Sequence, residues 1–404
     1  MPWADIATAA DSLNYASDLT HSLYRYPARM SPELARALIR GLTKPGGTVL
    51  DPFSGGGTTA IEALASGRRA ICSDLNALAC FVTMAKAWPT SRKALRIYQT
   101  WVHAVESRGA GATRAPRPLV TRDGLGYAPR THADLLSIRN SALRIADPEA
   151  RRLALLTVLR VGQICFDCRR TPPSPSILSA ALHEVTELVS QRMGSYAAEC
   201  GRHRWPGGLR RRLRVLRGDV REIVRRLHGP IREPVDLILT SPPYPGVHVL
   251  YHRWQVYGRK ETRLPYDLLS LSDGRFESHY TMGSRRRADE YYFDSLRSTF
   301  EALRRLTGPS TLVAQVVGFA DPARHLSRFR ETMSAAGYDE LVRPASSGSV
   351  VRSIPHRRWY TQVQPGQGNG EEVVLIHRPS APGTTARAAA SRTRRAEAVH
   401  PGDR

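Results

Sequence analysis

Two short motifs in this chain combine residue types and spacings that could carry out chemistry. The first, Asp51-Pro52-Phe53-Ser54-Gly55-Gly56-Gly57-Thr58-Thr59, follows a short apolar run and sets an acid beside three glycines. Glycine accepts positive φ angles and lets a ligand approach the backbone closely. The phosphate-loop pattern GxxxxGK[ST] is absent from it, and Asp51 would repel a phosphate. The motif therefore predicts a site for a cofactor other than ATP.

The second motif, Thr240-Ser241-Pro242-Pro243-Tyr244, ends a near-continuous apolar run from Val235 to Leu239. Its two prolines hold the backbone rigid and remove competing N–H donors. The Ser241 hydroxyl and the Pro242 carbonyl could then accept hydrogen bonds from an amine, whose lone pair would turn toward an electrophile. Tyr244 offers a face on which a planar ring could stack. The motif predicts a site that activates an amino group on a flat ring.

Together these motifs resemble those of the DNA amino-methyltransferases, which methylate the exocyclic nitrogen of cytosine or adenine. The resemblance implies S-adenosylmethionine (AdoMet) as cofactor and direct in-line methyl transfer to a base flipped out of double-stranded DNA. It assigns catalysis to the four residues Ser241, Pro242, Pro243 and Tyr244. It places the methionine part of the cofactor among Asp51, Phe53, Gly55, Gly57 and Thr58.

Two later acids stand where this family contacts the rest of the cofactor. Asp74 ends the next expected strand, where an acid accepts hydrogen bonds from ribose hydroxyls. Asp219 ends the following strand, at the position where family members hold the adenine amino group. Either acid could instead cap the helix that follows it. A third cofactor element is matched more loosely, through Tyr26, Pro27 and Arg29, and Arg29 is a candidate partner for the methionine carboxylate.

The elements around the motifs predict a doubly wound α/β sheet. Strands are expected at Thr48–Leu50 and Ala70–Asp74, joined by the glycine motif and a helix over Thr58–Ala65. The periodicity then turns helical until strands resume at Leu213. We expect a Rossmann-like, seven-stranded AdoMet-dependent methyltransferase sheet with a mostly helical insertion. Its expected parts are 1–85 for AdoMet binding, 86–212 for the helical insertion and candidate DNA-recognition region, 213–378 for the catalytic part, and 379–404 for a disordered basic tail.

The composition favours a nucleic-acid partner. Lys and Arg number 59 against 36 Asp and Glu, for a formal net charge of +23. A GC-rich genome would explain Arg in place of Lys, but it would not explain the excess over acids. Such an excess predicts salt-sensitive binding to phosphates. No stretch approaches the roughly 20 apolar residues that a membrane span needs, so we expect a cytoplasmic, nucleoid-associated protein.

The five cysteines do not suggest an even set of disulfides. Cys165-x-x-Cys168 and Cys200-x-x-His203 have the spacing of zinc ligands. However, Cys165 lies within an apolar run, where a cysteine usually packs as a small hydrophobic side chain. We therefore expect no metal site.

The target base and the recognition region stay open at the level of sequence. By the resemblance, serine at the first catalytic position favours cytosine N4 as the target. Adenine N6 is the alternative target, although family members that methylate adenine more usually have Asp or Asn at this position. The region that recognises the DNA sequence could be the helical insertion, the segment 248–287 around Trp254, or Arg357-Arg358-Trp359-Tyr360. In the last two segments aromatic and basic residues are interleaved, as a base-extruding protein would need. Ordinary surface loops would look the same in sequence.

Two other functions are compatible with the chain: an RNA methyltransferase of the same superfamily, and a non-catalytic DNA-binding relative. No nuclease motif is present. Within a restriction-modification system, a restriction endonuclease partner would therefore be a separate protein.

Overall fold

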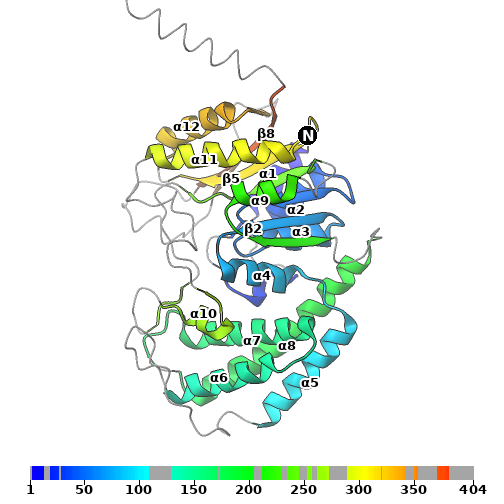
Figure 1. Cartoon of the computed structure of the whole chain (residues 1–404), viewed down its shortest axis with the longest axis vertical. Helices are drawn as coiled ribbons and strands as arrows, with labels where there is room; N and C mark the ends of the chain where they lie inside the picture. Colours follow the sequence, from blue (N-terminus) through cyan, green and yellow to red (C-terminus); the bar gives the residue numbers. More distant parts are fainter. Residues whose placement is uncertain are drawn as a thin grey trace, which may run out of the picture.

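The chain combines a sheet-containing part with a helical part, as the computed structural model shows (Figure 1). The structure describes residues 2–12, 19–26, 29–108, 129–171, 173–203, 212–228, 234–244, 253–256, 262–272, 289–319, 321–342, 350–353 and 371–381. The segment 354–370, which includes Arg357-Arg358-Trp359-Tyr360, and the tail from 382 lie outside these residues. None of the described helices is long and apolar enough to cross a membrane.

The sheet has the strand order β3-β2-β1-β4-β5-β8-β6, with β7 also paired to β8. Strands β1 to β5 are parallel to one another, and β8 runs antiparallel to β5. The predicted Rossmann-like α/β class is confirmed, and the sheet has eight strands rather than seven because the short β7 lies beside β8. The strands are β1 (Thr48–Asp51), β2 (Arg69–Asp74), β3 (Leu213–Arg217), β4 (Leu237–Thr240), β5 (Leu312–Gly318), β6 (Tyr338–Glu340), β7 (Val350–Ser353) and β8 (Glu371–Pro379).

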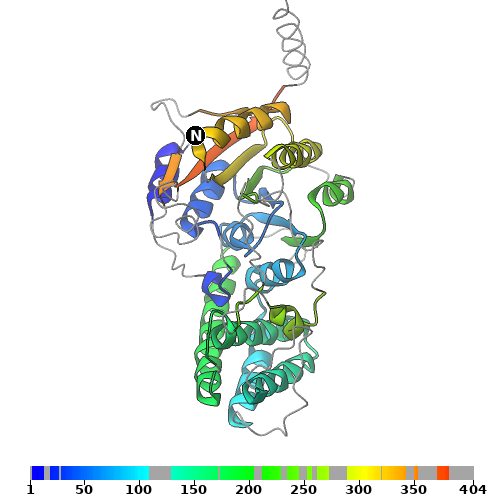
Figure 2. The same ribbon diagram turned by 90° about the vertical axis from the view of Figure 1, so that its left-hand side faces the viewer.

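Side chains on each central strand alternate between two hydrophobic cores, one on each face of the sheet. Val49 and Leu239 pack with α1 (Trp3–Asp11), α2 (Pro32–Leu42) and α3 (Thr58–Ala65). Leu50 and Ile238 pack on the opposite face with α9 (Val220–His228), α11 (Asp289–Leu303) and α12 (Pro322–Ala335). Figure 2 shows these helices around the sheet from a second direction.

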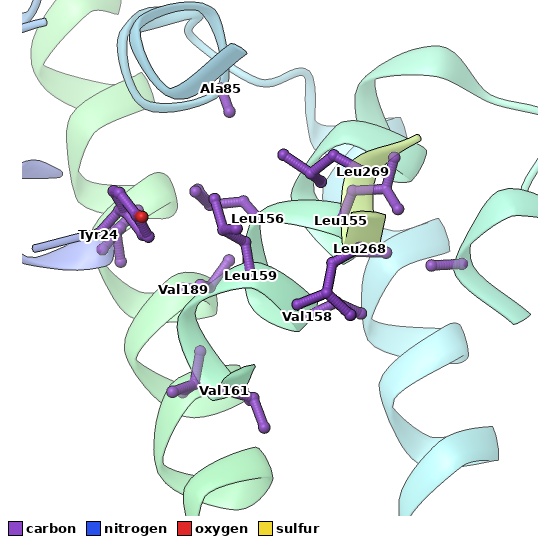
Figure 3. Close-up of a cluster of buried hydrophobic side chains, with 14 of the residues drawn as sticks. Tyr24, Ala85, Leu155, Leu156, Val158, Leu159, Val161, Val189, Leu268 and Leu269 are labelled. Carbon is purple, nitrogen blue, oxygen red and sulfur yellow. The ribbon is translucent and has the colours of Figure 1, made fainter. Parts of the chain in front are cut away.

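The helical part has a third hydrophobic core of its own, part of which is drawn in Figure 3. Asp147 caps one of its long helices by accepting hydrogen bonds from the backbone N–H groups of Glu149 and Ala150. Residues from outside the insertion also enter this core, including Tyr24 and Leu268. Its helices are α4 (Ala77–Ala87), α5 (Arg92–Arg108), α6 (Pro129–Leu143), α7 (Pro148–Phe166), α8 (Pro175–Gly201) and α10 (Leu264–Leu269).

Trp254 lies in this helical core, so within the candidate segment 248–287 this residue is neither a DNA contact nor part of an exposed loop. Its side chain is 1% exposed, and its indole N–H donates to the Tyr24 hydroxyl at 3.0 Å. The surrounding aromatic and basic residues Tyr251, His252, Tyr257, Arg259 and Lys260 lie outside the described residues. An aromatic side chain amid charged neighbours looks the same in sequence whether it faces solvent or a core.

The cysteines with zinc-like spacing do not come together in the structure. Cys165 is buried on α7 in the helical core, whereas Cys200 is buried on α8 in a core of the sheet. Among the described residues, no group of three or more His, Cys, Asp and Glu side chains could hold a metal ion.

Replacing Trp254 by Ala is expected to lower the free energy of unfolding by about 3–5 kcal/mol, because it removes a large buried side chain and leaves a cavity. Chemical denaturation measures this loss. The control is Val342→Ala, which alters a side chain that is 69% exposed and should change stability by less than about 0.5 kcal/mol. A Trp254→Ala protein that kept its stability and lost DNA affinity would contradict the core assignment.

Candidate active site

The residues singled out in the sequence gather at one edge of the sheet, where the parallel strands end. Asp51 ends β1, Asp74 ends β2, and Ser241 directly follows β4. Strand order reverses between β1 and β4, which are neighbours. Open α/β sheets bind their ligands in the crevice at such a reversal. The glycine motif and the Ser-Pro-Pro-Tyr motif therefore face the same crevice.

A direct hydrogen bond joins the two motifs. Thr240 Oγ1 donates to Asp51 Oδ1 at 2.9 Å, and the Phe53 backbone N–H donates to the same oxygen at 3.1 Å. The Asp51 side chain is buried, and burial raises its pKa to about 6 despite the opposing hydrogen bonds from Thr59, Phe53 and Thr240. Asp51 thus fixes the end of β4 against the end of β1.

The glycine loop takes a conformation that side chains would not permit. Gly57 has φ of +80°, and a Cβ on it would lie 2.9 Å from the Cα of Thr83 on α4. The Tyr26 side chain packs over Gly55 and Gly56, where an added Cβ would lie 3.5 Å from Tyr26 Cε1 and 3.0 Å from Tyr26 Cβ respectively. The loop is therefore held between α4 and the segment that carries Tyr26.

Lys86 also supports this loop, although the sequence motifs did not identify it. Its Nζ donates to the Gly56 carbonyl at 2.8 Å, and its side chain is 1% exposed. Burial, with a smaller effect from the Arg29 charge, lowers its pKa to about 7. A lone lysine within the otherwise apolar run of α4 was the signal in the sequence that could have identified it.

Asp74 connects the loop to the start of α4. Its Oδ2 accepts from the Gly55 backbone N–H at 2.9 Å, and its Oδ1 accepts from the Asn76 backbone N–H at 2.9 Å. The helix cap itself is Asn76, whose side chain accepts from Leu78 and Ala79. Burial raises the pKa of Asp74 to about 6. Asp74 thus ties the glycine loop to the end of β2.

Asp219 lies at the same edge of the sheet but has a different partner. Its carboxylate accepts from the backbone N–H and the guanidinium of Arg221, each at 2.8 Å. The hydrogen bonds from the Arg221 side chain are the largest cause of the lowered pKa of Asp219. The structure thus places Asp219 at the start of α9, paired with Arg221.

The third predicted cofactor element lies beside the glycine loop. Arg29 Nη1 donates to the His21 carbonyl at 3.0 Å. Gln163 of α7 holds the neighbouring backbone by accepting from Arg25 N–H at 3.1 Å and donating to Arg25 C=O at 2.8 Å. Pro27 lies outside the described residues.

Ser241 and Tyr244 form a compact hydrogen-bonded pair. Their hydroxyl oxygens lie 2.9 Å apart, and Ser241 Oγ donates to the Val316 carbonyl of β5 at 2.8 Å. Tyr244 is 8% exposed, so most of its ring is covered in this conformation. Pro242 is buried and Pro243 is half-buried between them.

Two other predicted residues belong to the structural support of the loop. Phe53 packs in the core shared with α9 and α11. Thr58 is the buried first residue of α3, next to Gly57.

The chemistry of the acceptors at this edge fits AdoMet. The two buried carboxylates can accept hydrogen bonds from hydroxyl and ammonium groups. Asp51, Asp74 and the loop from Gly55 to Gly57 would hold the cofactor, while Ser241 lies across the β1–β4 boundary from them.

The strand order and the edge site define a Rossmann-like fold of the methyltransferase type. Residues 8–84 match the family model described as "DNA methylase" for N6 and N4 enzymes. Over this segment the resemblance to the DNA amino-methyltransferase family is confirmed, and the match implies AdoMet as methyl donor. The chain is also 42% identical over 76 residues to the Type II methyltransferase M.MvaI of Kocuria varians, a stretch that covers 18% of this chain and 16% of that protein.

Among solved structures, the similar chains include TrmN from Thermus thermophilus and the rRNA methyltransferase aviRa from Streptomyces viridochromogenes. TrmN has a TM-score of 0.32 and 14% identity, over 89% of this chain and 51% of TrmN. The aviRa enzyme has a TM-score of 0.31 and 13% identity, over 93% of each chain. Scores this low carry no functional argument.

Gly57→Ala is expected to weaken AdoMet binding by about tenfold or more, because a Cβ at φ +80° is strained and would press on Thr83. Isothermal titration calorimetry measures the dissociation constant. The matched control is Gly194→Ala on α8, where nothing lies within 4 Å of an added Cβ. Equal affinities for wild type and Gly57→Ala would show that the loop does not contact the cofactor.

AdoMet affinity is expected to fall by about two- to tenfold between pH 7.5 and pH 5, the contribution of one hydrogen bond. Protonation of Asp51 and Asp74 below about 6 removes acceptors for the cofactor. The unliganded protein should change in the opposite sense. A folded-state pKa above the ordinary value means that these two groups add stability as the pH falls from about 6 toward 4.

Calorimetry on wild type and Asp74→Asn across this pH range tests that expectation. The variant should bind more weakly at pH 7.5 and show a flatter pH profile. An identical profile in the two proteins would exclude Asp74 as a cofactor acceptor.

Proposed function

We propose that this protein is a site-specific DNA methyltransferase that transfers the methyl group of AdoMet to an exocyclic amine, with cytosine N4 favoured over adenine N6. The observation that carries the proposal is the junction of β1 and β4. There the Thr240–Asp51 hydrogen bond sets the glycine loop beside Ser-Pro-Pro-Tyr. A cofactor-binding loop and an amine-binding motif would have to be adjacent in this way for direct transfer.

In this mechanism the chain supplies positioning and hydrogen-bond acceptors. AdoMet, when bound, supplies an electrophilic methyl group. Ser241 Oγ and the Pro242 carbonyl accept the amino protons of the flipped base, so that the nitrogen lone pair turns toward the methyl group. The rigid Pro242-Pro243 backbone keeps these acceptors in place. Because Tyr244 is covered by neighbouring residues, stacking of the base on its ring would need a change in its surroundings.

The preference for cytosine rests on Ser241. The hydroxyl is a neutral acceptor that can also donate, and the resemblance associates serine at this position with N4 methylation. Methylation of adenine N6 would use the same geometry and the same two acceptors. The proposed reaction is therefore the same whichever of the two bases is the target.

Double-stranded DNA is the proposed substrate, supported by the net charge of +23 and by the family match. A separate restriction endonuclease is a proposed partner, suggested by the name of the Type II relative. A DNA substrate would be found in the cytoplasm on the nucleoid, which is the proposed location of the protein.

Ser241→Ala is expected to lower the methylation rate by about 100- to 1000-fold, because it removes an acceptor used in the transition state. Modified-base sequencing of DNA from cells that express each protein measures this. The control is Ser298→Ala on α11, whose hydroxyl donates within its own helix to the Ser295 carbonyl. AdoMet binding by Ser241→Ala should equal that of wild type.

N4-methylcytosine in one short sequence, absent with Ser241→Ala, would support the full proposal. N6-methyladenine would retain the mechanism and overturn the base preference. If DNA carried neither base while labelled methyl groups entered RNA, the proposed DNA substrate would be wrong.

A further inference from the structure

A chain of hydrogen bonds leads from Ser241 into the interior of the sheet. Ser241 Oγ lies 2.9 Å from Tyr244 Oη, and Tyr244 Oη donates to Glu372 Oε1 at 2.9 Å. The other oxygen of Glu372 accepts from Arg352 Nη1 at 3.0 Å. Glu372 and Arg352 have side-chain exposures of 2% and 1%. A buried ion pair thus lies two hydrogen bonds away from Ser241.

The position of this pair follows from the added strand β7. In the sheet, Glu372 of β8 is in register with Arg352 of β7 on one side and with Gly318 of β5 on the other. The end of β5 also supplies the Val316 carbonyl, which accepts from Ser241 at 2.8 Å and lies 3.3 Å from Tyr244 Oη. The pair therefore lies on β7 and β8, next to β5, which neighbours the strand that leads into the catalytic motif.

Stability is a poor reason for a buried ion pair, because well-packed apolar residues of similar volume are often as stabilising or more so. The free energy of burying two charges is large, and only good geometry with further hydrogen bonds offsets it. Here the further hydrogen bond on Glu372 comes from the catalytic motif itself, through Tyr244. This suggests a role in the site.

The number of hydroxyl protons available determines which group donates and which accepts in each hydrogen bond of this network. Glu372, ionised opposite Arg352, and the Val316 carbonyl can only accept. Ser241 and Tyr244 have one hydroxyl proton each. A carboxylate is the strongest acceptor present, so it takes the proton of Tyr244. The Ser241 proton then points inward, to Tyr244 Oη or to Val316, and the lone pairs of Ser241 Oγ are left for a donor in the crevice.

We infer that Glu372 and Arg352 are positioning residues, which act through Tyr244 to orient the Ser241 hydroxyl as an acceptor for the amine of the target base. This inference rests on the proposed function of Ser241. Hydrogen bonds in such a chain polarise one another, so donation toward the carboxylate makes Ser241 Oγ a stronger acceptor. Tyr244 thereby has a second role, in linking Ser241 to the ion pair.

Three variants test this chain in the full-length protein. Tyr244→Phe breaks the link and leaves the ion pair in place. Arg352→Met with Glu372→Met removes both charges together at similar volume, which avoids leaving one buried charge unpaired. Arg352→Met with Glu372→Gln restores a neutral acceptor for Tyr244. The measurement is single-turnover transfer from methyl-labelled AdoMet to mixed-sequence DNA from cells that lack the protein, alongside melting temperature and AdoMet affinity.

Tyr244→Phe and the double-methionine variant should each lower the transfer rate by about 10- to 100-fold, the effect of losing a charge-assisted hydrogen bond. AdoMet affinity should stay within about twofold of wild type, since none of these residues supports the glycine loop. The glutamine variant should recover part of the rate. Combining Tyr244→Phe with the double-methionine change should cost no more than either alone, because both break one chain.

The control removes a second Arg–Glu pair, which lies beside the other end of β8, away from the site. Arg330 and Glu340 are joined by two hydrogen bonds, at 2.8 and 3.2 Å, between α12 and β6. Arg330→Met with Glu340→Met should leave the transfer rate unchanged.

An inactive wild type would contradict both the proposed function and the role of this hydrogen-bond network. An active wild type with an equally active double-methionine variant would contradict the role of the hydrogen-bond network but not the proposed function. If the losses in transfer rate were additive and paralleled the decrease in melting temperature, Glu372 and Arg352 would have a structural role only.

Discussion

The adjacency of β1 and β4 is the constraint on which the rest of the site depends. Asp51 and Thr240, the last residues of these two parallel strands, are 189 positions apart in the sequence, yet their side chains form a hydrogen bond of 2.9 Å. The hydrogen bond is buried, so a shift of either strand would remove one of the donors to a buried carboxylate. Cofactor loop and amine-binding motif are thus aligned by the sheet itself.

Buried charge is concentrated around this junction. Asp51, Asp74 and Lys86 are each inside the protein, and burial shifts the pKa of each toward neutrality. Charged groups are retained in such surroundings only where they satisfy hydrogen bonds or bind a ligand. Here Asp74 and Lys86 hold the glycine loop from two sides, through Gly55 N–H and the Gly56 carbonyl. The protein's own hydrogen bonds thus hold the loop.

The helical part is coupled to the site by the N-terminal segment. Tyr24 packs in the helical core and accepts a hydrogen bond from Trp254, and Gln163 of α7 clamps the backbone of Arg25. Two residues later, Tyr26 covers the glycine loop. Three successive residues, Tyr24, Arg25 and Tyr26, therefore join the helical part to the glycine loop.

The sequence by itself determined the local features: the glycine loop after β1, the Pro-Pro motif after β4, and the alternation of strands and helices that defines the fold class. These follow from backbone chemistry and periodicity within a few residues. Only the tertiary structure decided which side chains meet across strands. Lys86, Thr83, Glu372 and Arg352 have no local signature, because their roles depend on contacts far apart in the chain. The sequence also did not predict the burial of Trp254, since burial is a property of the whole fold.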